Sequence, residues 1–374
     1  MAGVYIHIPF CKKACHYCDF HFSTSLQNKE LLVEALCLEI ALRKDYLENK
    51  KLSTIYFGGG TPSLLTPAEL NKILSKIKER FDIFPDAEIT LEANPDDLII
   101  EKINELTEAG INRLSIGIQS FFDEDLERMN RSHTAKQAIQ AVENAKIGGI
   151  HNISIDLIYG LPNLTIEKWA ANLEQAFKLD VPHLSAYCLT IEEKTAFNTF
   201  LQKGQITLPK EPETIAQFEL LMSEAAKHNF IHYEISNFCK EGQQSKHNSN
   251  YWSNEHYIGI GPSAHSYNGV SRQFNVKNNS IYIKGITTGT PNVEMELLTK
   301  ENKFNEYIMT RLRTIWGISP SFISQGFGED VLNSFLSGAE PYVSSGHLQW
   351  QQDSLILTQK GKLLADKIAS DLFV

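Results

Sequence analysis

Residues 5–18 read YIHIPFCKKACHYC, and this stretch decides how the rest of the chain is interpreted. Residues 4–8 are rich in β-formers and predict a first strand. Three cysteines, Cys11, Cys15 and Cys18, follow directly in a C-x3-C-x2-C run. Three thiolates in one loop suit three corners of a cubane iron–sulfur cluster, which in a full site is held by four protein thiolates. By analogy with catalytic metals, the iron left open is a place for substrate or cofactor.

Two other interpretations of the cysteine loop stay open. Zinc could take the three cysteines with His16 or His21, although structural zinc sites more often use paired C-x2-C spacing. The three thiols could also be clustered by coincidence. Cys37 and Cys188 lie in a predicted helix and a predicted strand, which indicates core thiols. Cys239 lies in a polar segment and stays open as a distant fourth ligand.

The composition is that of an ordinary globular protein with about two domains. The 374 residues are 42% hydrophobic and 21% charged, and 35 Lys+Arg against 45 Asp+Glu give a net charge of −10. This balance argues against broad nucleic-acid binding, so no nucleic-acid partner is expected. No apolar run approaches the roughly 18 residues of a membrane span, and the first strand is too short for a signal peptide. We therefore expect a cytoplasmic protein with reduced cysteines.

Strands and helices alternate along residues 1–235. Strands are predicted at 4–8, 53–57, 88–92, 113–118, 153–159 and 183–189. Helices are predicted at 29–49, 66–80, 101–109, 134–147, 166–179 and 211–228. The second of these helices opens with the capping box TPAE at 66–69. Repeated strand–helix units predict an α/β fold with a parallel sheet, and six units fit a closed or partly open β/α barrel.

The pattern changes after the barrel region. Residues 236–299 contain a polar stretch that we interpret as a long irregular connection, and such loops are usually functional or disordered. Residues 300–374 predict a helix at 304–314, strands at 347–350 and 354–357, and a helix at 360–372. That order predicts a small winged-helix-like α/β cap. We interpret the cap as a packing domain rather than a DNA-recognition domain.

Three phrases at predicted strands narrow the interpretation. Residues 5–11 read YIHIPFC, residues 58–62 read GGGTP, and residues 156–162 read DLIYGLP. A C-x3-C-x2-C run after the first strand, with a glycine-rich loop after the second, resembles the radical S-adenosylmethionine (SAM) superfamily. The three phrases resemble the oxygen-independent coproporphyrinogen III oxidase family and its close relative, the HemW-type haem chaperones. The resemblance covers nearly the whole chain and implies a partial β/α barrel with the cap described above.

The resemblance also implies cofactors. A 4Fe-4S cluster would be held by the three loop cysteines, with SAM chelated to its open iron. One electron from a donor would cleave SAM to methionine and a 5′-deoxyadenosyl radical. The family pattern places SAM contacts at nine positions, namely Tyr5, Gly59, Gly60, Thr61, Glu92, Gln119, Arg131, Asp156 and Thr190.

Several of these residue types suit SAM on physical grounds. The glycines at 59 and 60 let backbone N–H groups approach the methionine end. Glu92 could pair with the amino group or a ribose, Arg131 can grip a carboxylate with two hydrogen bonds, and Asp156 suits ribose hydroxyls. Strand ends of a β/α barrel are where such residues gather. Purely structural roles also stay open. The glycines could form a tight turn, and Glu92 and Asp156 could be polar groups of the barrel core that neighbours satisfy. Arg131 could form a surface salt bridge.

Two features separate the oxidases from the chaperones. The oxidases carry a fourth cysteine two residues after the third, and this chain has Phe20 at that position. The oxidases also have an N-terminal arm before the cluster strand, whereas the first cysteine of this chain is already residue 11. Residues 247–252 read HNSNYW and resemble the H-N-x-x-Y-W motif of the chaperone branch. Because a neutral imidazole is a good axial iron ligand, His247 is the candidate haem ligand. His265, in GPSAH at 261–265, is the alternative.

The leading hypothesis is a haem chaperone. The chain would bind the cluster, SAM and haem, and would pass haem to an acceptor protein, plausibly a haem enzyme at the membrane, so peripheral membrane association is part of the expectation. The alternative is an enzyme that oxidatively decarboxylates coproporphyrinogen III to protoporphyrinogen IX. A third hypothesis, a winged-helix regulator that senses iron, is disfavoured by the acidic balance.

Overall fold

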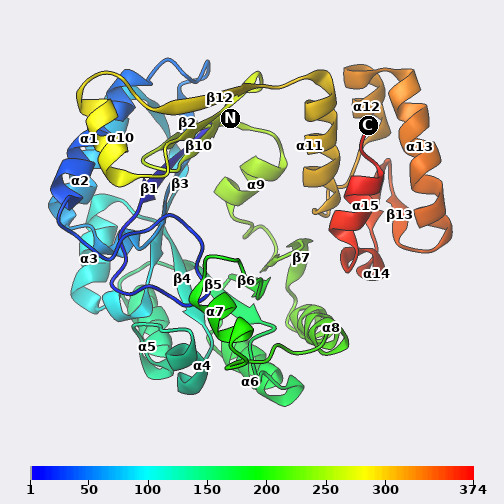
Figure 1. The fold of residues 1–374 in the computed structure, drawn as a ribbon, viewed down its shortest axis with the longest axis horizontal. Coiled ribbons are helices and arrows are strands. Elements are labelled where there is room, and N and C mark those ends of the chain that lie inside the picture. The colour runs from blue at the N-terminus through cyan, green and yellow to red at the C-terminus, as the bar shows by residue number, and fades with distance from the viewer. Residues whose placement is uncertain (1) are drawn as a thin grey trace.

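The computed structural model describes residues 2–374, and Figure 1 shows the course of the chain. One large sheet contains β1 (Ala2–Ile8), β2 (Lys51–Gly59), β3 (Asp82–Ala93), β4 (Arg113–Gln119), β5 (Asn152–Tyr159), β6 (His183–Cys188), β7 (Ile231–Glu234), β8 (Asn237–Cys239), β9 (His256–Ile260), β10 (His265–Tyr267), β11 (Ser271–Asn275) and β12 (Val293–Leu297). Its strand order is β12-β11-β10-β9-β1-β2-β3-β4-β5-β6-β8-β7. The six strands β1 to β6 therefore lie side by side in chain order.

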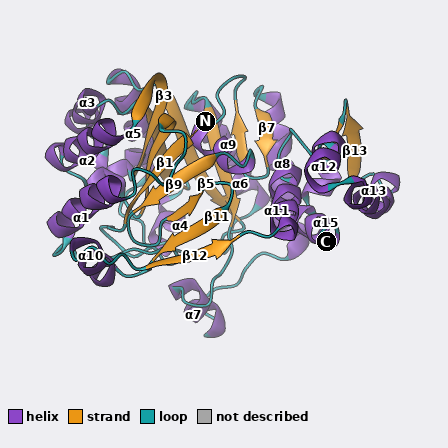
Figure 2. Ribbon diagram, turned by 90° about the horizontal axis from the view of Figure 1, so that it is seen from above, coloured by secondary structure: helices purple, strands orange, loops and turns teal. Residues whose placement is uncertain are grey.

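Strands β1 to β6 pair in parallel, as the sequence predicts. Helices follow the strands and cover their outer face in Figure 2. These helices are α1 (Lys29–Leu42), α2 (Pro67–Arg80), α3 (Ile100–Ala109), α5 (Ala135–Ile147), α6 (Ile166–Lys178) and α8 (Glu211–Lys227). The arrangement confirms the partial β/α barrel, because the sheet ends at β12 and β7 instead of closing on itself.

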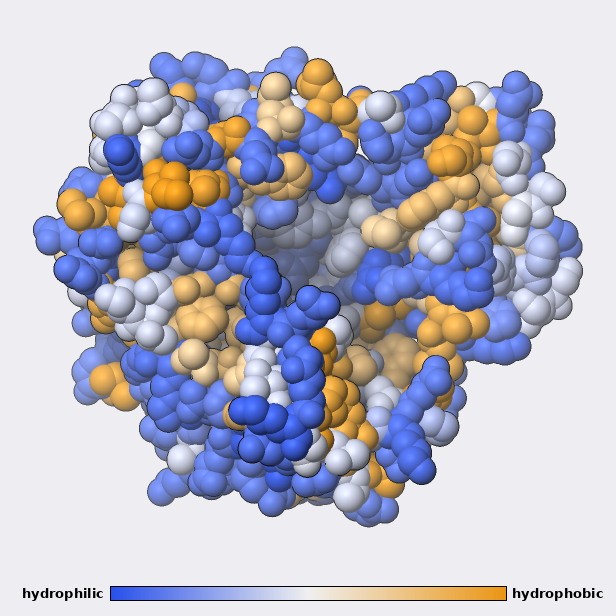
Figure 3. All heavy atoms as spheres, viewed as in Figure 1, coloured by the Kyte–Doolittle hydropathy of each residue, from blue (hydrophilic) through white to orange (hydrophobic). Residues whose placement is uncertain are grey.

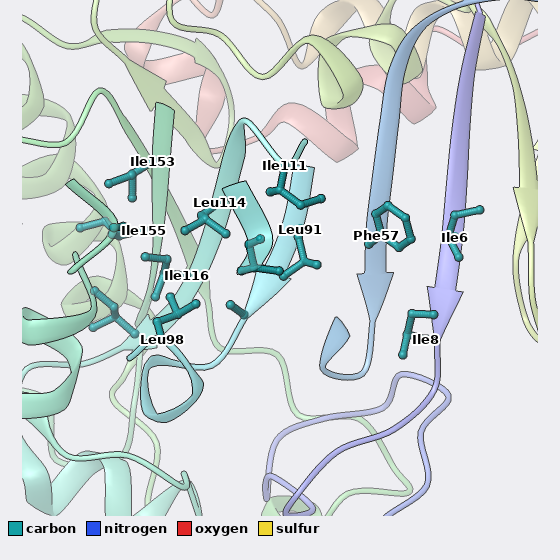
Figure 4. Close-up of a cluster of buried hydrophobic side chains, with 14 of the residues drawn as sticks. Ile6, Ile8, Phe57, Leu91, Leu98, Ile111, Leu114, Ile116, Ile153 and Ile155 are labelled. Atoms are coloured by element: carbon teal, nitrogen blue, oxygen red, sulfur yellow. The ribbon is translucent and has the colours of Figure 1, made fainter. Parts of the chain in front are cut away.

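Alternation along the strands gives the barrel two different faces. Ile6, Phe57, Leu91, Leu114 and Ile155 are fully buried in the hydrophobic core between strands and helices, which Figure 4 shows in close-up. The residues between them in sequence point the other way, into the barrel, because successive side chains of a strand alternate. Strand pairing brings these inward residues level with one another across the sheet. Polar inward residues thus line the inside.

Local signals explain where several helices begin and end. The Thr66 side chain accepts a hydrogen bond from the Glu69 backbone N–H while the Glu69 carboxylate accepts from Thr66, which confirms the capping box. Gly110 ends α3 with a φ of 96°. The predicted first helix was too long, since α1 ends at Leu42, and the predicted third strand was too short. Two short helices, α4 (Asp123–Arg128) and α7 (Ala196–Gln202), were not predicted, because at six and seven residues each is too short to show a helical period.

The prediction of an irregular connection at 236–299 was wrong. This segment contains β8 to β12, α9 (Lys246–Trp252) and α10 (Asn279–Thr287). β9 pairs in parallel with β1, and β10, β11 and β12 extend the sheet antiparallel from it. The strands are five residues or shorter, so each carries too little alternation to be recognised in sequence.

The C-terminal residues have a core of their own. The cap contains α11 (Lys300–Leu312), α12 (Pro320–Phe327), α13 (Glu329–Ser344), the hairpin β13 (Leu348–Gln351) and β14 (Ser354–Leu357), α14 (Gln359–Lys362) and α15 (Ala365–Asp371). Its buried residues form a cluster separate from the barrel core. Three helices followed by a hairpin fit a winged-helix-like cap, although α12 and α13 were not predicted and the predicted helix at 360–372 is divided into α14 and α15. Within residues 2–374, no helix combines the length and the apolar character that a bilayer crossing requires.

Candidate functional site

The cysteine loop lies at the carboxyl end of β1. Its three thiols, Cys11, Cys15 and Cys18, are free and half-buried. Burial raises the pKa of Cys18 to about 11 and also raises that of Cys11. Free thiols with such pKa values are protonated at neutral pH, and bound metal ions supply the positive charge that stabilises thiolates.

The loop is anchored by a segment that follows α4. The His16 backbone N–H donates to the Met129 carbonyl (3.0 Å), and His16 Nδ1 lies 2.8 Å from the Arg128 carbonyl. Asn130 donates its side-chain N–H to the Ala14 carbonyl (2.8 Å). Among residues 2–374, no three His, Cys, Asp or Glu side chains come together closely enough to hold a single metal ion.

Arg131 ties the cysteine loop to the barrel. Its Nη1 donates to Cys15 Sγ (3.3 Å) and to the Tyr17 hydroxyl (3.4 Å), and its Nη2 donates to Asn94 Oδ1 and the Gly117 carbonyl (2.7 Å each). The Nε atom is buried without a partner among the described residues. This geometry excludes a surface salt bridge. The guanidinium is an internal cation beside the thiols, fixed by the ends of β3 and β4.

The glycine-rich loop packs directly against the cysteine loop. A Cβ on Gly60 would lie 2.7 Å from the Phe10 carbonyl oxygen, and Gly59 has a φ of 108°. The Gly59 N–H donates to Glu92 Oε2 (3.1 Å) and the Gly60 N–H to the Ile8 carbonyl (2.9 Å). Both amides already have protein partners, so the glycines serve close approach rather than providing free donors.

Two carboxyl groups lie half-buried on the inside of the barrel. Glu92 accepts from the Tyr56 hydroxyl (2.8 Å) as well as from Gly59. Asp156 lies 3.5 Å from the Ser115 hydroxyl. Burial raises the pKa of Glu92 to about 7, with the nearby Asp156 charge adding to the effect, and burial raises the pKa of Asp156 to about 6. Because neither carboxyl has a cationic hydrogen-bond partner, each suits a ligand with N–H or O–H donors.

Three of the remaining predicted SAM positions also lie around this space. Tyr5 points into the barrel from β1, and its hydroxyl is 3.1 Å from His7 Nδ1. Thr61 is buried after β2. Gln119 ends β4 with a φ of 69°, and its side chain lies beside Gly117. Thr190 is exposed two residues beyond β6, and the structure shows no contact that draws it toward the others.

His247 does not face open space. The residue is buried in α9, with Nδ1 at 2.8 Å from the Thr54 hydroxyl and Nε2 at 2.9 Å from the Tyr251 hydroxyl. Its ring stacks on Tyr56 at 4.9 Å, and its backbone N–H donates to Glu88 Oε1 (3.0 Å). Burial lowers the pKa of His247 to about 3, so the ring is neutral. With both ring nitrogens bonded, it joins α9 to the inside of the barrel.

Two cavities adjoin α9. One, of about 440 Å³, lies between β1, the cysteine loop and β9–β10 and is lined by Tyr5, Tyr251 and His265 among others. The other, of about 310 Å³, lies between α9 and α11 and is lined by Trp252 and Arg272 among others. In Figure 3 the surface is hollowed in the region where Figure 1 places α9. Sequence reasoning found the motif but not these cavities.

The other cysteines lie apart from the loop. Cys37 is buried in α1, as predicted, but Cys188 is exposed, so its assignment to the core was wrong. Cys239 is buried in β8 and pairs with His183 at the amino end of β6. The cysteine loop lies at the carboxyl end of the parallel strands, so Cys239 is at the wrong end of the barrel to be a fourth ligand.

Comparison with known proteins gives the class first. Residues 5–176 match the family model of the radical SAM superfamily, and residues 298–364 match the HemN C-terminal domain. The solved structure described as "Coproporphyrinogen III oxidase (HemN) from Escherichia coli is a Radical SAM enzyme" superimposes with a TM-score of 0.87, covering 100% of this chain and 90% of the other at 23% identity. That likeness shows the fold. Residues 5–176 form a radical SAM domain, and that family implies a 4Fe-4S cluster and SAM.

Sequence similarity then gives the family. The chain is 38% identical to the Bacillus subtilis (strain 168) protein named heme chaperone HemW, covering 98% of both chains. The protein of the same name from Escherichia coli (strain K12) is 33% identical, covering 98% of this chain and 96% of the other. The protein of the same name from Mycobacterium tuberculosis (strain H37Rv) is 32% identical, covering 99% of this chain and 94% of the other. The chain belongs to the HemW family.

The residues present fit the two implied cofactors. Three unpaired thiols in one loop are the donors that iron–sulfur clusters take. An internal guanidinium beside Cys15 offsets the negative charge of thiolates. Gly59 and Gly60 let the glycine-rich loop pack directly against the His7 ring and the Phe10 backbone, next to the cysteine loop. The fit rests on this donor set and not on any bound group.

Proposed function

We propose that the chain binds haem beside a cluster and SAM site and transfers the haem to an acceptor protein. The relationship to heme chaperones over 98% of the chain carries the proposal. The structure supports it with three free thiols at the strand ends and a cavity of about 440 Å³ next to them. That volume falls in the roughly 300–1,000 Å³ range of small-molecule pockets.

In this proposal Cys11, Cys15 and Cys18 hold the 4Fe-4S cluster, and the cluster with SAM supplies one-electron chemistry when both are bound. Arg131 keeps the loop in place through Cys15 and Tyr17. Its four hydrogen bonds to protein groups give it a positioning role in addition to any contact with SAM. A loop held at this many points keeps three thiols in one arrangement.

We propose that SAM lies across the strand ends between the glycine-rich loop and the inward carboxyls. Glu92 and Asp156 offer acceptors to the amino group and the ribose hydroxyls. A ligand with such donors would supply hydrogen bonds that these two carboxyls do not receive from the protein. The full set of proposed contacts is Tyr5, Gly59, Gly60, Thr61, Glu92, Gln119, Arg131, Asp156 and Thr190.

Haem is the cargo and not a resident cofactor. His247 as its iron ligand stays a prediction, and it requires one ring nitrogen to give up its hydrogen bond, because both are bonded in this structure. The acceptor in this proposal is a haem enzyme at the cytoplasmic face of a membrane, reached by a peripherally associated chaperone. A cellular reductant donates the electron.

The test separates transfer from catalysis. Cluster-reconstituted protein is incubated anaerobically with coproporphyrinogen III, SAM and dithionite, and porphyrins are separated by chromatography beside an active oxidase as control. We expect no protoporphyrinogen from this chain. In parallel, haem-loaded protein is mixed with an apo haem protein, and the Soret band of the acceptor is followed. Many turnovers to protoporphyrinogen would favour the oxidase instead, and failure to bind haem would reject the chaperone.

A further inference from the structure

The two edges of the large sheet differ in what covers them. At one edge, the segment that follows α11 lies against β7, and the Ile315 N–H donates to the Tyr233 carbonyl (3.0 Å). At the other edge, β12 pairs with β11 on one side only. Among residues 2–374, no strand pairs with its other side, and Figure 2 shows β12 at the rim of the sheet. β12 is therefore an open edge.

The register with β11 shows which backbone groups of β12 are unused. The Leu298 N–H, directly after β12, donates to the Val270 carbonyl (3.1 Å). In an antiparallel ladder, hydrogen-bonded pairs alternate with pairs that are not bonded, so the even-numbered residues of β12 direct their N–H and C=O groups to β11. The odd-numbered residues, Val293, Met295 and Leu297, direct theirs away from the sheet. An exposed row of such groups is a template for pairing with another strand.

β12 lacks features that commonly protect an edge strand. Natural edges often carry lysine, proline or a β-bulge. The sequence of β12 is VEMEL, without lysine or proline, and its pairing with β11 has no shift in register. Met295 and Leu297 are 62% and 67% exposed. Because successive side chains of a strand alternate, Val293 lies in the same row, and this apolar row favours contact with a further strand.

The other row of β12 side chains is acidic. Glu294 and Glu296 are exposed, and no lysine or arginine among the described residues forms an ion pair with either carboxylate. Arg272, which lies opposite Glu296 on β11, pairs with Glu306 instead (3.0 Å). Opposite charges on facing residues of neighbouring strands stabilise a sheet, and like charges destabilise it. The acidic row therefore favours a strand that carries lysine or arginine at alternate positions.

The same charges disfavour a second copy of this chain on the edge. A two-fold pairing of β12 with itself is antiparallel. Centred on Met295, it places Glu294 of each copy opposite Glu296 of the other. Centred on either glutamate, it places that glutamate opposite itself. Because each of these registers opposes like charges, the edge suits a different protein better than a second copy.

We propose that β12 is a docking edge for a partner protein, which adds an extended segment to the sheet as one more strand. In that segment lysine or arginine faces Glu294 and Glu296, and apolar side chains alternate with them to cover Met295 and Leu297. Main-chain hydrogen bonds to the free groups of β12 hold such a segment, and its side chains give specificity. The inference goes beyond the proposed function, since neither haem nor the cluster takes part in it.

The experiment is a binding titration of the full-length, cluster-reconstituted protein with a labelled peptide of alternating lysine and valine, followed by fluorescence anisotropy. A peptide of the same composition with its lysines grouped at one end controls for charge alone, and we expect it to bind at least tenfold more weakly. Hydrogen exchange locates the bound peptide, and we expect slower exchange at the Met295 and Leu297 amides. The even-numbered amides of β12 should change less, because they are already bonded to β11.

Variants separate the edge from the general charge of the protein. Met295→Pro removes an outward N–H without breaking a bond to β11 and should raise the Kd at least tenfold, whereas Met295→Val keeps the N–H and should leave the Kd unchanged. Glu294→Gln combined with Glu296→Gln should raise the Kd severalfold. The matched control makes the same charge change on α3, where Glu101→Gln with Glu108→Gln replaces two exposed glutamates and should leave the Kd unchanged.

The inference is overturned if the alternating peptide does not bind, if it binds without slowing exchange in β12, or if Met295→Pro, folded by circular dichroism, keeps the Kd. It is also overturned if analytical ultracentrifugation shows a dimer that Met295→Pro dissociates, because a second copy is then the occupant. If Met295→Pro does not fold, the exchange measurement and the double glutamine variant decide. None of these results bears on haem transfer, so the proposed function is tested separately.

Discussion

Glu92→Gln should change how the stability of the protein depends on pH. Glu92 accepts hydrogen bonds from the Tyr56 hydroxyl and the Gly59 N–H, and burial raises its pKa from 4.5 to about 7. A group that binds its proton more tightly in the folded state destabilises that state increasingly as pH rises from about 4.5 to 7, and the full cost remains above pH 7. The difference of about 2.5 in pKa corresponds, at about 1.36 kcal/mol each, to about 3 kcal/mol.

The assay is urea unfolding of cluster-free protein between pH 4.5 and 8. We expect the free energy of unfolding of Glu92→Gln, relative to that of the unmodified chain, to rise by about 3 kcal/mol between pH 4.5 and 7. Above pH 7 this difference should stay constant. Asp156→Asn should gain between about pH 3.8 and 6, so only Glu92→Gln changes between pH 6 and 7. The exposed Glu108→Gln is the control. A difference that is constant from pH 4.5 to 8 would refute the reasoning.

Three further predictions concern the loops and the helices. Gly60→Ala places a Cβ 2.7 Å from a backbone oxygen, so it should lower the free energy of unfolding, measured in urea, by about 1–3 kcal/mol. The control is Gly326→Ala, because Gly326 is an exposed residue of α12 with nothing near its Cβ position, and this variant should raise the free energy of unfolding by up to about 1 kcal/mol. Thr66→Ala breaks a capping box and should lower the melting temperature through a loss of about 1 kcal/mol, seen in a thermal scan. Cys18→Ser should abolish cluster absorbance after reconstitution, and exposed Cys188→Ser should leave it unchanged; equal loss in both would contradict the assignment.

Much of the barrel follows from local sequence. The apolar residues of β1 to β6 recur at every second position, and each strand is followed by a helix with its own start or stop signal, as Thr66 and Gly110 show. The cysteine loop and the glycine-rich loop also had to meet, because both follow neighbouring parallel strands. Strand order and the position of the two loops were therefore predictable.

Other parts of the site were not predictable. Arg131 was expected to bind a ligand or lie at the surface, yet it is held by Cys15, Asn94 and Gly117, which come from three separate segments. Nothing in the local sequence of residues 129–131 predicts that they anchor the cysteine loop. Segment 236–299 was misjudged because its strands are short and gain their order by pairing with β1.

The sequence by itself determined the barrel and the cysteine and glycine loops, since periodicity and spacing are properties of neighbouring residues, and its motifs carried the resemblance to the family. Only the tertiary structure decided which side chains are free to bind a ligand. The sequence favours His247 over His265 as a haem ligand because of its motif, but in the structure His247 has both ring nitrogens bonded inside the barrel and His265 lines a cavity. The physical reason is that burial and hydrogen bonding of a side chain depend on residues brought together from distant parts of the chain.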